Sequence, residues 1–192
     1  ADIHCVFDDL PPVVGYAVTA TVRSATPPPV GQVYADRTDW WNYIATVPTP
    51  RIVVVQDLDE RPGLGAFLGE VHANVLRALG CVAYVTNGAV RDLPGVRRSH
   101  LQAFAGSVSP SHAFVHIVSF AEPVEVAGLK VSSGDLLFGD RHGIVGIPQD
   151  VAPKIPSIVG AMRLRDRRIV EFCRSHDFKV DALRSIVQDW DS

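Results

Sequence analysis

Glu70, Arg91 and Asp92 are the residues of this chain best suited to chemistry on a small anionic substrate. The two carboxylates offer the oxygen ligands that a hard divalent cation prefers, and the guanidinium binds carboxylate or enolate oxygens. A 2-oxo acid presents a carboxylate beside a carbonyl, and together these two groups chelate such a cation. As carbanion character develops next to the carbonyl, the cation and Arg91 stabilise the enolate oxygen more than they stabilise the ground state. These residues therefore predict cleavage of a carbon–carbon bond.

A strand, helix, strand unit is expected to position these side chains. Residues 51–58 have the continuous apolar centre of a parallel strand that is covered on both faces, and residues 59–69 are rich in glycine. The spacing predicts a helix over 70–79, followed by a second strand over 81–86 that ends at Asn87-Gly88. In a right-handed unit of this kind, the loops after both parallel strands open at the same edge of the sheet. Glu70 and the Arg91-Asp92 pair should therefore meet in one crevice.

The start of the predicted helix adds a backbone site for an anion. Gly69 and Glu70 lie at its first turn, where the free amides of Val71 and His72 can receive a carboxylate. His72 lies in reach of such a ligand, although a solvated histidine at the helix start is the default interpretation. The residues expected on the buried face of the helix are Val71, Val75, Ala78 and Leu79.

The remaining pattern predicts an α/β fold with helices at the carboxyl end of the chain. Residues 15–22 are rich in β-branched side chains and predict a strand, and Asp39 is expected to cap a short helix that buries Trp40 and Ile44. Further strands are expected over 113–120, 122–129, 136–140 and 143–148, and further helices over 151–175 and 181–190.

Composition limits the classes of protein to which the chain can belong. The 192 residues suffice for one well-buried core, so we expect a single domain over 1–192. With 47% hydrophobic residues and a net charge of −3, the sequence contains no apolar run near the roughly 18 residues of a membrane helix. No secretory signal pattern opens the sequence, so a cytoplasmic location is expected by default. The basic clusters at 97–98 and 163–168 are short, and direct binding to nucleic acid is not expected.

Other candidate motifs favour structural roles. The glycines at 63–69 imitate a dinucleotide loop, but four residues separate them from the strand and no acid ends the next strand. His112 and His116 are expected in one strand, where positions i and i+4 lie roughly 13 Å apart and cannot share a metal ion. Residues 140–142 are expected to form a turn. The three cysteines form no CxxC pair and are interpreted as free thiols.

Several segments together resemble one known family. Glu70, twenty intervening residues and Arg91-Asp92 are similar to the acid, twenty residues, Arg-Asp motif of the family that contains the RraA regulators of ribonuclease E and the metal-dependent 4-hydroxy-4-methyl-2-oxoglutarate aldolases. GYAVTA, NGAVRD and VSSGDLLFGDRHGIVGIP resemble further segments of that family in the same order. The resemblance covers roughly residues 13–178. Two departures are Asn87, where the family often has Asp, and the lack of an acid shortly after Asp92.

The resemblance implies a swivelling β/β/α-type, RraA-like single domain with a central mixed sheet and C-terminal helices. It also implies homo-oligomers, trimers or hexamers, with sites between subunits that bind Mg²⁺ or Mn²⁺. Asp92 is then the direct metal ligand, Glu70 acts through metal-bound water, and Arg91 with the amides after Glu70 holds pyruvate or its enolate. An acid from the C-terminal helix of a neighbouring subunit completes the site. Asp166 is the best match for this acid, with Glu171 second.

Two functions follow from the resemblance. The first is a divalent-metal-dependent lyase that cleaves a 4-hydroxy-2-oxo acid to pyruvate by a retro-aldol reaction, or that decarboxylates oxaloacetate. The alternative is a non-catalytic regulator of the RraA type that binds and inhibits a ribonuclease. Retention of Glu70, Arg91 and Asp92 favours the enzyme, although a regulator can also keep these residues.

Overall fold

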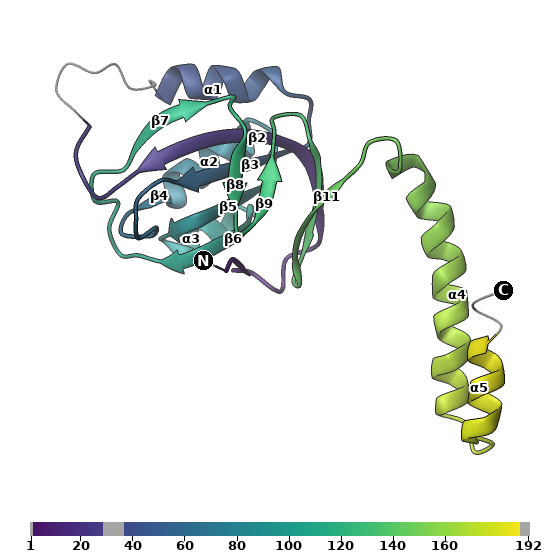
Figure 1. Ribbon diagram of the computed structural model, residues 1–192. Helices are drawn as coiled ribbons and strands as arrows, with labels where there is room; N and C mark the ends of the chain where they lie inside the picture. Colours follow the sequence, from purple (N-terminus) through teal and green to yellow (C-terminus); the bar gives the residue numbers. More distant parts are fainter. Residues whose placement is uncertain (1, 29–36, 189–192) are drawn as a thin grey trace. The chain divides into compact units, whose positions relative to one another are not determined.

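The computed structural model describes residues 2–28 and 37–188 (Figure 1). The chain divides into two compact units, residues 1–148 and 149–192, and each is described by itself. The expectation of a single domain over 1–192 stays a prediction.

A mixed sheet forms the first unit (Figure 1). Its main path runs β1-β6-β5-β3-β2-β10-β11, while β4 pairs with β5 and β7 pairs with β2. The four central strands, β2, β3, β5 and β6, are parallel, and antiparallel strands flank them. This arrangement confirms the predicted α/β class with a central mixed sheet. The strands are β1 (His4–Cys5), β2 (Val13–Arg23), β3 (Arg51–Asp57), β4 (Ala66–Leu68), β5 (Cys81–Val90), β6 (Gln102–Val108), β7 (His116–Phe120), β10 (Leu136–Asp140) and β11 (Gly143–Ile147).

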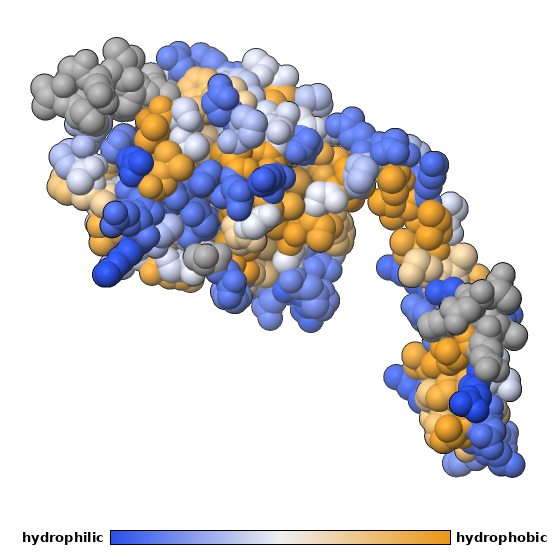
Figure 2. All heavy atoms as spheres, in the orientation of Figure 1, coloured by the Kyte–Doolittle hydropathy of each residue, from blue (hydrophilic) through white to orange (hydrophobic). Residues whose placement is uncertain are grey.

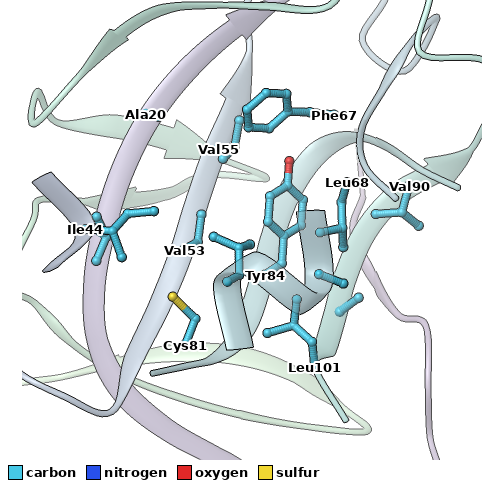
Figure 3. Close-up of a cluster of buried hydrophobic side chains, with 14 of the residues drawn as sticks. Ala20, Ile44, Val53, Val55, Phe67, Leu68, Cys81, Tyr84, Val90 and Leu101 are labelled. Carbon is cyan, nitrogen blue, oxygen red and sulfur yellow. The ribbon is translucent and has the colours of Figure 1, made fainter. Parts of the chain in front are cut away.

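The central strands are buried on both faces, and their apolar side chains point alternately to two separate cores. Val53 and Val55 of β3 pack in one core with Tyr84 and with Ile44 of α1 (Arg37–Thr46) (Figure 3). Side chains from α2 (Glu70–Ala78) and α3 (Leu93–Arg98) belong to the same core. Ile52 and Val54 face the other core, which the hairpin of β8 (Val124–Val126) and β9 (Leu129–Val131) covers. A strand covered on both faces is what the sequence of β3 predicted. Trp40 and Ile44 of α1 are fully buried, as predicted. The prediction that Asp39 caps this helix was wrong, because α1 already includes Arg37 and Asp39 lies in its first turn.

The buried face of α2 was predicted wrongly. Ala73 and Leu76 are the buried residues of this helix, whereas Val71 is 81% exposed. The helix carries two adjacent apolar stripes at helical spacing, and periodicity alone cannot rank them. The sheet selects the stripe with Ala73 and Leu76, which leaves Val71 and Ala78 in solvent and Val75 partly covered.

Several boundaries also differ from the predictions. β5 does not end at Asn87-Gly88 but continues to Val90, with a register shift between Thr86 and Ala89. The Asn87 side chain accepts a hydrogen bond from the amide of Asp57 at 2.7 Å and donates one to its carbonyl at 3.0 Å. These bonds continue the contact between β3 and β5 beyond their last paired residues, Val55 and Thr86. The strand predicted at 113–120 begins only at His116. The single strand predicted at 122–129 is instead β8 at Val124–Val126 followed by a turn that leads into β9 at Leu129.

The second unit consists of helices. It contains a short 3-10 turn at Ala152–Lys154, α4 (Ile155–Cys173) and α5 (Val180–Gln188), which confirms the predicted C-terminal helices. α4 buries no residue, and Figure 2 shows apolar side chains on the surface of this unit. Phe172 and Phe178 are in contact, with ring centroids 5.7 Å apart. No helix in the described part of the chain is long and apolar enough to cross a membrane.

Truncating the buried and the exposed apolar residues of α2 should give different results. Leu76→Ala removes a fully buried side chain and leaves a cavity, so the free energy of unfolding should fall by about 2–5 kcal/mol. Val71→Ala, the matched control on the same helix, should change it by less than about 0.5 kcal/mol. Urea denaturation followed by circular dichroism measures both values. Equal losses in the two variants would contradict the orientation of α2.

Candidate active site

The structure brings Glu70, Arg91 and Asp92 together at one edge of the sheet. Glu70 is the first residue of α2, and Arg91 follows β5, where its amide donates to the carbonyl of Leu68 in β4 at 3.0 Å. One carboxylate oxygen of Asp92 accepts from Nη1 of Arg91 at 2.7 Å and from the backbone amide of Glu70 at 3.3 Å. Two loops that lie twenty residues apart in sequence therefore meet, as the strand, helix, strand unit predicted.

Two glycines make this close approach possible. A Cβ atom on Gly69 would lie 2.7 Å from Oδ2 of Asp92 and 2.9 Å from Cζ of Arg91. A Cβ atom on Gly95, in α3, would lie 2.4 Å from Cδ of Glu70. Each glycine thus leaves the space that a site carboxylate occupies. Sequence reasoning missed Gly95, and the available signal was a glycine inside a helix, where alanine is favoured by about 1 kcal/mol.

Asp92 turns the chain from β5 into α3 in a left-handed backbone conformation. Its φ of 54° and ψ of 40° are uncommon for residues other than glycine, although aspartate tolerates them better than most. The carbonyl of Asp92 accepts the amides of Gly95 at 2.8 Å and Val96 at 3.0 Å. These bonds hold the first turn of α3 and keep the Asp92 backbone in this conformation. Such conformations are concentrated at functional sites, because the surrounding structure must enforce them.

Arg98 is a second site residue that sequence reasoning missed. Its Nη2 atom donates to Oε1 of Glu70 at 3.0 Å, so each of the two carboxylates has an arginine partner. The side chains of Arg98 and Glu70 are 67% and 47% exposed, and an ion pair this exposed contributes at most about 1 kcal/mol. The pair can therefore rearrange when a ligand binds. The sequence had identified Arg97-Arg98 only as a short basic cluster.

The guanidinium of Arg91 retains hydrogen-bonding capacity. Its Nε atom is buried and has no hydrogen-bond partner among the described residues. A buried donor without a partner is costly in free energy, and it is relieved when a ligand oxygen accepts from it. Arg91 thus pairs with the Asp92 carboxylate through Nη1 and keeps one donor, Nε, for which the described residues provide no acceptor.

The donor atoms fit a hard, hydrated divalent cation. Asp92 and Glu70 supply carboxylate oxygens, and within the described residues no group of three or more His, Cys, Asp or Glu is arranged to hold a metal ion. Mg²⁺ is commonly bound through one or two carboxylates while it keeps several waters. The two carboxylates match that pattern, whereas a closed site of nitrogen and sulfur ligands, as for zinc, has no counterpart here.

His72 is not the solvated histidine of the default interpretation. Its Nδ1 atom lies 3.4 Å from the carbonyl oxygen of Phe67. Its ring packs edge to face against the Phe67 ring, with the two ring centroids 4.6 Å apart. Burial is the largest cause that lowers the pKa of His72, to about 4, and the nearby Arg37 guanidinium acts in the same direction. The hydrogen bond to the Phe67 backbone raises this pKa but does not outweigh burial. The imidazole is therefore neutral at neutral pH. Because a carbonyl only accepts, Nδ1 carries the proton and Nε2 is an acceptor.

His72 lines a cavity of about 700 Å³ that Arg91 also lines. His112 and His116 line it too, and the prediction that both lie in one strand was wrong, because the chain enters β7 only at His116. Their Nδ1 atoms lie 2.6 Å from the Ala113 carbonyl and 2.9 Å from the Phe114 carbonyl, respectively. The cavity lies between α1, α2, β4 and the loop that leads into β7.

The other predicted residues belong to elements that do not form this site. Asp140 and His142 occupy the turn of the β10–β11 hairpin, where His142 Nδ1 lies 3.2 Å from Asp140 Oδ2, as expected for a turn. Asp166 and Glu171 are exposed residues of α4 in the second unit. Their approach to the site of a neighbouring subunit stays a prediction.

Comparisons with known proteins agree on one family. A family model described as RraA-like, Aldolase/RraA, matches residues 1–145. Protein DlpA of Legionella pneumophila is 24% identical over 131 residues, which make up 67% of this chain and 21% of DlpA. A protein of Halalkalibacterium halodurans with the name "Putative 4-hydroxy-4-methyl-2-oxoglutarate aldolase" is 26% identical over 85 residues, 44% of this chain and 40% of that protein. The chain thus spans well under two thirds of the length of these curated relatives.

A solved structure shows the same fold. RraAS2 of Streptomyces coelicolor, described as an unusual member of the RNase ES inhibitor RraA protein family, matches with a TM-score of 0.65 and 22% identity. The match covers 92% of this chain and 82% of RraAS2. At this level of identity the likeness establishes the architecture, and the function has to be argued from the site.

Removing His72 should alter how stability depends on pH. The folded-state pKa of about 4 lies below the ordinary value of 6.5, so on acidification the unfolded state binds the proton first. His72 thus contributes a loss of stability as the pH falls from 6.5 to 4, and none of that loss occurs above 6.5. His72→Asn keeps a donor for the Phe67 carbonyl and should flatten this part of the profile. Urea midpoints measured between pH 4 and 7 test this, with His142→Asn as an exposed control. An unchanged slope in His72→Asn would contradict the buried, neutral imidazole.

Proposed function

Because the chain belongs to the Aldolase/RraA family, we propose that it is a divalent-metal-dependent lyase that acts on a small 2-oxo acid. The observation that carries the proposal is the convergence of Arg91, Asp92 and Glu70 on shared hydrogen bonds at one edge of the sheet. Two carboxylates for a hard cation, beside a guanidinium with an unused donor, match the polar atoms of a 2-oxo acid. The proposed reaction is retro-aldol cleavage of a 4-hydroxy-2-oxo acid to pyruvate, or decarboxylation of oxaloacetate.

In this proposal Arg91 binds and orients the substrate. Its planar guanidinium holds the Asp92 carboxylate through Nη1 and has Nε left for a substrate oxygen. The first amides of α2, those of Val71 and His72, lie beyond Gly69 at a helix start, where an anion is stabilised by backbone N–H groups. Substrate held between these donors presents its carbonyl oxygen to the positive charge of Arg91.

The bond changes require stabilisation of one developing negative charge. In the retro-aldol reaction the C3–C4 bond breaks, its electron pair passes toward the carbonyl oxygen, and the C4 hydroxyl loses its proton to become a new carbonyl. In decarboxylation the electron pair that passes toward the carbonyl oxygen comes from the carbon–carbon bond to the carboxylate that leaves as CO₂. Mg²⁺ or Mn²⁺ held by Asp92 and by Glu70 would supply Lewis-acid polarisation of the carbonyl. Arg91 favours the reaction because its interaction strengthens as the oxygen becomes an enolate.

A second subunit completes the proposed site. The helical unit that carries Asp166 and Glu171 buries none of the residues of α4 and exposes Ile158, Met162 and Leu164. Exposed apolar side chains along a helix favour packing against another surface. We therefore propose a homo-oligomer, a trimer or hexamer, in which α4 supplies Asp166, or Glu171 as second choice, to a neighbouring site.

A regulator of the RraA type is the second candidate. The observation that favours it is the Arg98–Glu70 ion pair, because it engages one of the two proposed metal ligands. In that case the chain acts through its surface on a ribonuclease, and the edge of the sheet holds no cation. Metal binding at Asp92 separates the two candidates.

Asp92→Asn should abolish metal binding and metal-dependent cleavage. A hard cation with only one or two protein carboxylates depends strongly on each formal charge, while the amide keeps the size of the side chain. Calorimetric titration should detect no binding of Mn²⁺ to this variant. Pyruvate release from oxaloacetate and from 4-hydroxy-2-oxo acids should show at least about a hundredfold loss of turnover. Asp9→Asn is the matched control, since Asp9 is also an exposed aspartate paired with an arginine, Arg97. If Asp92→Asn retained its affinity for Mn²⁺ and its turnover, Asp92 would have no part in a metal site.

Arg91→Lys should preserve the fold and lose most of the activity. Lysine keeps the positive charge but lacks the planar fork, so it cannot bind the Asp92 carboxylate and a substrate oxygen in the same way. Loss of one preorganised donor to a developing oxyanion costs about 10²–10³-fold in turnover. The measurement is turnover at saturating Mn²⁺, with Arg97→Lys, in the Asp9 ion pair, as control. Equal turnover in Arg91→Lys and the parent would make Arg91 a structural residue only.

A further inference from the structure

Arginines supply the positive charge in the described lining of the cavity beside Arg91. Among the residues that the structure describes, its lining contains two arginines and three histidines, and no aspartate or glutamate: Arg37, Arg91, His72, His112 and His116. A cavity of this kind favours an anion. At about 700 Å³ it falls in the size range of sites for ligands much larger than a three-carbon acid.

Aromatic side chains form much of the remaining wall. Trp41 of α1, Phe67 of β4 and Phe114 of the loop before β7 all line the cavity. Phe114 is 57% exposed and Val71, which also lines the cavity, is 81% exposed, so apolar surface stays in water until a ligand covers it. Burial of that surface against an aromatic ring is favourable through both its area and its ring contacts.

The wall at Phe114 is preformed. The amide of Phe114 donates to the carbonyl of Ser24 at 3.2 Å, and a Cβ atom on Gly65 would lie 2.5 Å from the carbonyl oxygen of His112. The loop that carries Phe114 is thus in close contact with Ser24, directly after β2, and with Gly65, directly before β4. A preformed wall does not have to be ordered when a ligand binds, which favours affinity.

Two unsatisfied donors belong to residues that line the cavity. The indole Nε1 of Trp41 and the Nε of Arg91 are both buried and lack a hydrogen-bond partner among the described residues. Buried donors are nearly always paired in folded proteins. Because both residues line the cavity, oxygen atoms of a ligand bound there are candidate partners for these donors.

From these observations we propose that the cavity is the subsite for the leaving half of the substrate, and that this half is an aromatic group. The inference rests on the proposed lyase function. Arg91 belongs to both places, so it holds the 2-oxo acid end while the ring lies among Trp41, Phe67 and Phe114. The C3–C4 bond breaks, its electron pair stays with the 2-oxo acid half, and C3 takes up a proton to give pyruvate. The C4 hydroxyl loses its proton, and C4 leaves as the carbonyl carbon of an aromatic aldehyde.

Binding of probes that cannot be cleaved tests the subsite without turnover. 4-Phenyl-2-oxobutanoate and 2-oxobutanoate both lack a C4 hydroxyl, so calorimetry with and without Mn²⁺ compares their affinities directly. The phenyl compound should bind about tenfold or more tightly than 2-oxobutanoate, because its ring is buried in the cavity. Phe114→Ala should remove most of that difference and leave 2-oxobutanoate binding unchanged. Leu64→Ala is the matched control, since Leu64 has the same 57% exposure but is not among the residues lining the cavity.

The outcomes separate this inference from the proposed function. Equal affinities of the two probes would overturn the subsite, even if oxaloacetate or 4-hydroxy-2-oxo acids release pyruvate. A phenyl preference that depends on Phe114 supports the subsite, and absence of pyruvate release from every 2-oxo acid would then count against the lyase alone. If Phe114→Ala changes the oligomeric mass in light scattering but not the affinity for the phenyl probe, this wall is a subunit contact and the subsite proposal is wrong.

A second variant tests the role of the indole donor. Trp41→Phe keeps a ring and removes the N–H group, so it should leave binding of 4-phenyl-2-oxobutanoate unchanged. It should lower kcat/KM for 4-hydroxy-4-phenyl-2-oxobutanoate by about tenfold, since only this compound carries an oxygen at C4. The formation of benzaldehyde measures this rate. Equal loss with both compounds would mean that Trp41 acts through packing.

Discussion

The close approach of two turns, one between β4 and α2 and one between β5 and α3, is the constraint on which the candidate site depends. No side chain fits between them at Gly69, where an added Cβ would lie 2.7 Å from the Asp92 carboxylate, or at Gly95, where it would lie 2.4 Å from Cδ of Glu70. The approach lets one oxygen of Asp92 accept from both the Arg91 side chain and the Glu70 amide. The geometry of the charged groups therefore follows from backbone packing, which is fixed before any ligand binds.

A buried polar network holds the strand that delivers Arg91. β5 carries an irregularity at Asn87-Gly88, and the amide group of Asn87 both accepts from and donates to the backbone of Asp57 in β3. The Asp57 carboxylate accepts the amides of Asp59 and Gly63, although burial raises its pKa. An aspartate at position 87 could not donate to the Asp57 carbonyl while ionised. The departure from the family's usual residue thus has a structural explanation in this chain, because the network lets β5 continue past the irregularity to pair with β4.

The sequence predicted the parts of the fold in which one physical signal dominates. β3 has a continuous apolar run that only a doubly covered strand explains, and Glu70 follows a glycine-rich segment that must end before a helix begins. β6, with the sequence QAFAGSV, was missed because its small side chains have little intrinsic strand preference and its burial is imposed by β5 and β1. α3 was missed because it is short and contains Pro94 and Gly95. Gly95 and Arg98 act on the site through α3, so both were lost with that helix.

Charge balance would link the proposed cation and the proposed substrate to the arginines of the candidate site. Glu70 and Asp92 carry two negative charges and Arg91 and Arg98 two positive charges, so their formal sum is zero. A divalent cation at the two carboxylates would leave two positive charges in excess, and a 2-oxo acid would reduce that excess by one. The cation therefore favours the anion, and by linkage the anion favours the cation to the same extent. Arg91 carries this coupling, because one guanidinium contacts the Asp92 carboxylate and lines the cavity beside it. Rotation of Arg91 toward a substrate oxygen would release part of the Asp92 carboxylate to the cation, which makes the two binding events steps of a single rearrangement.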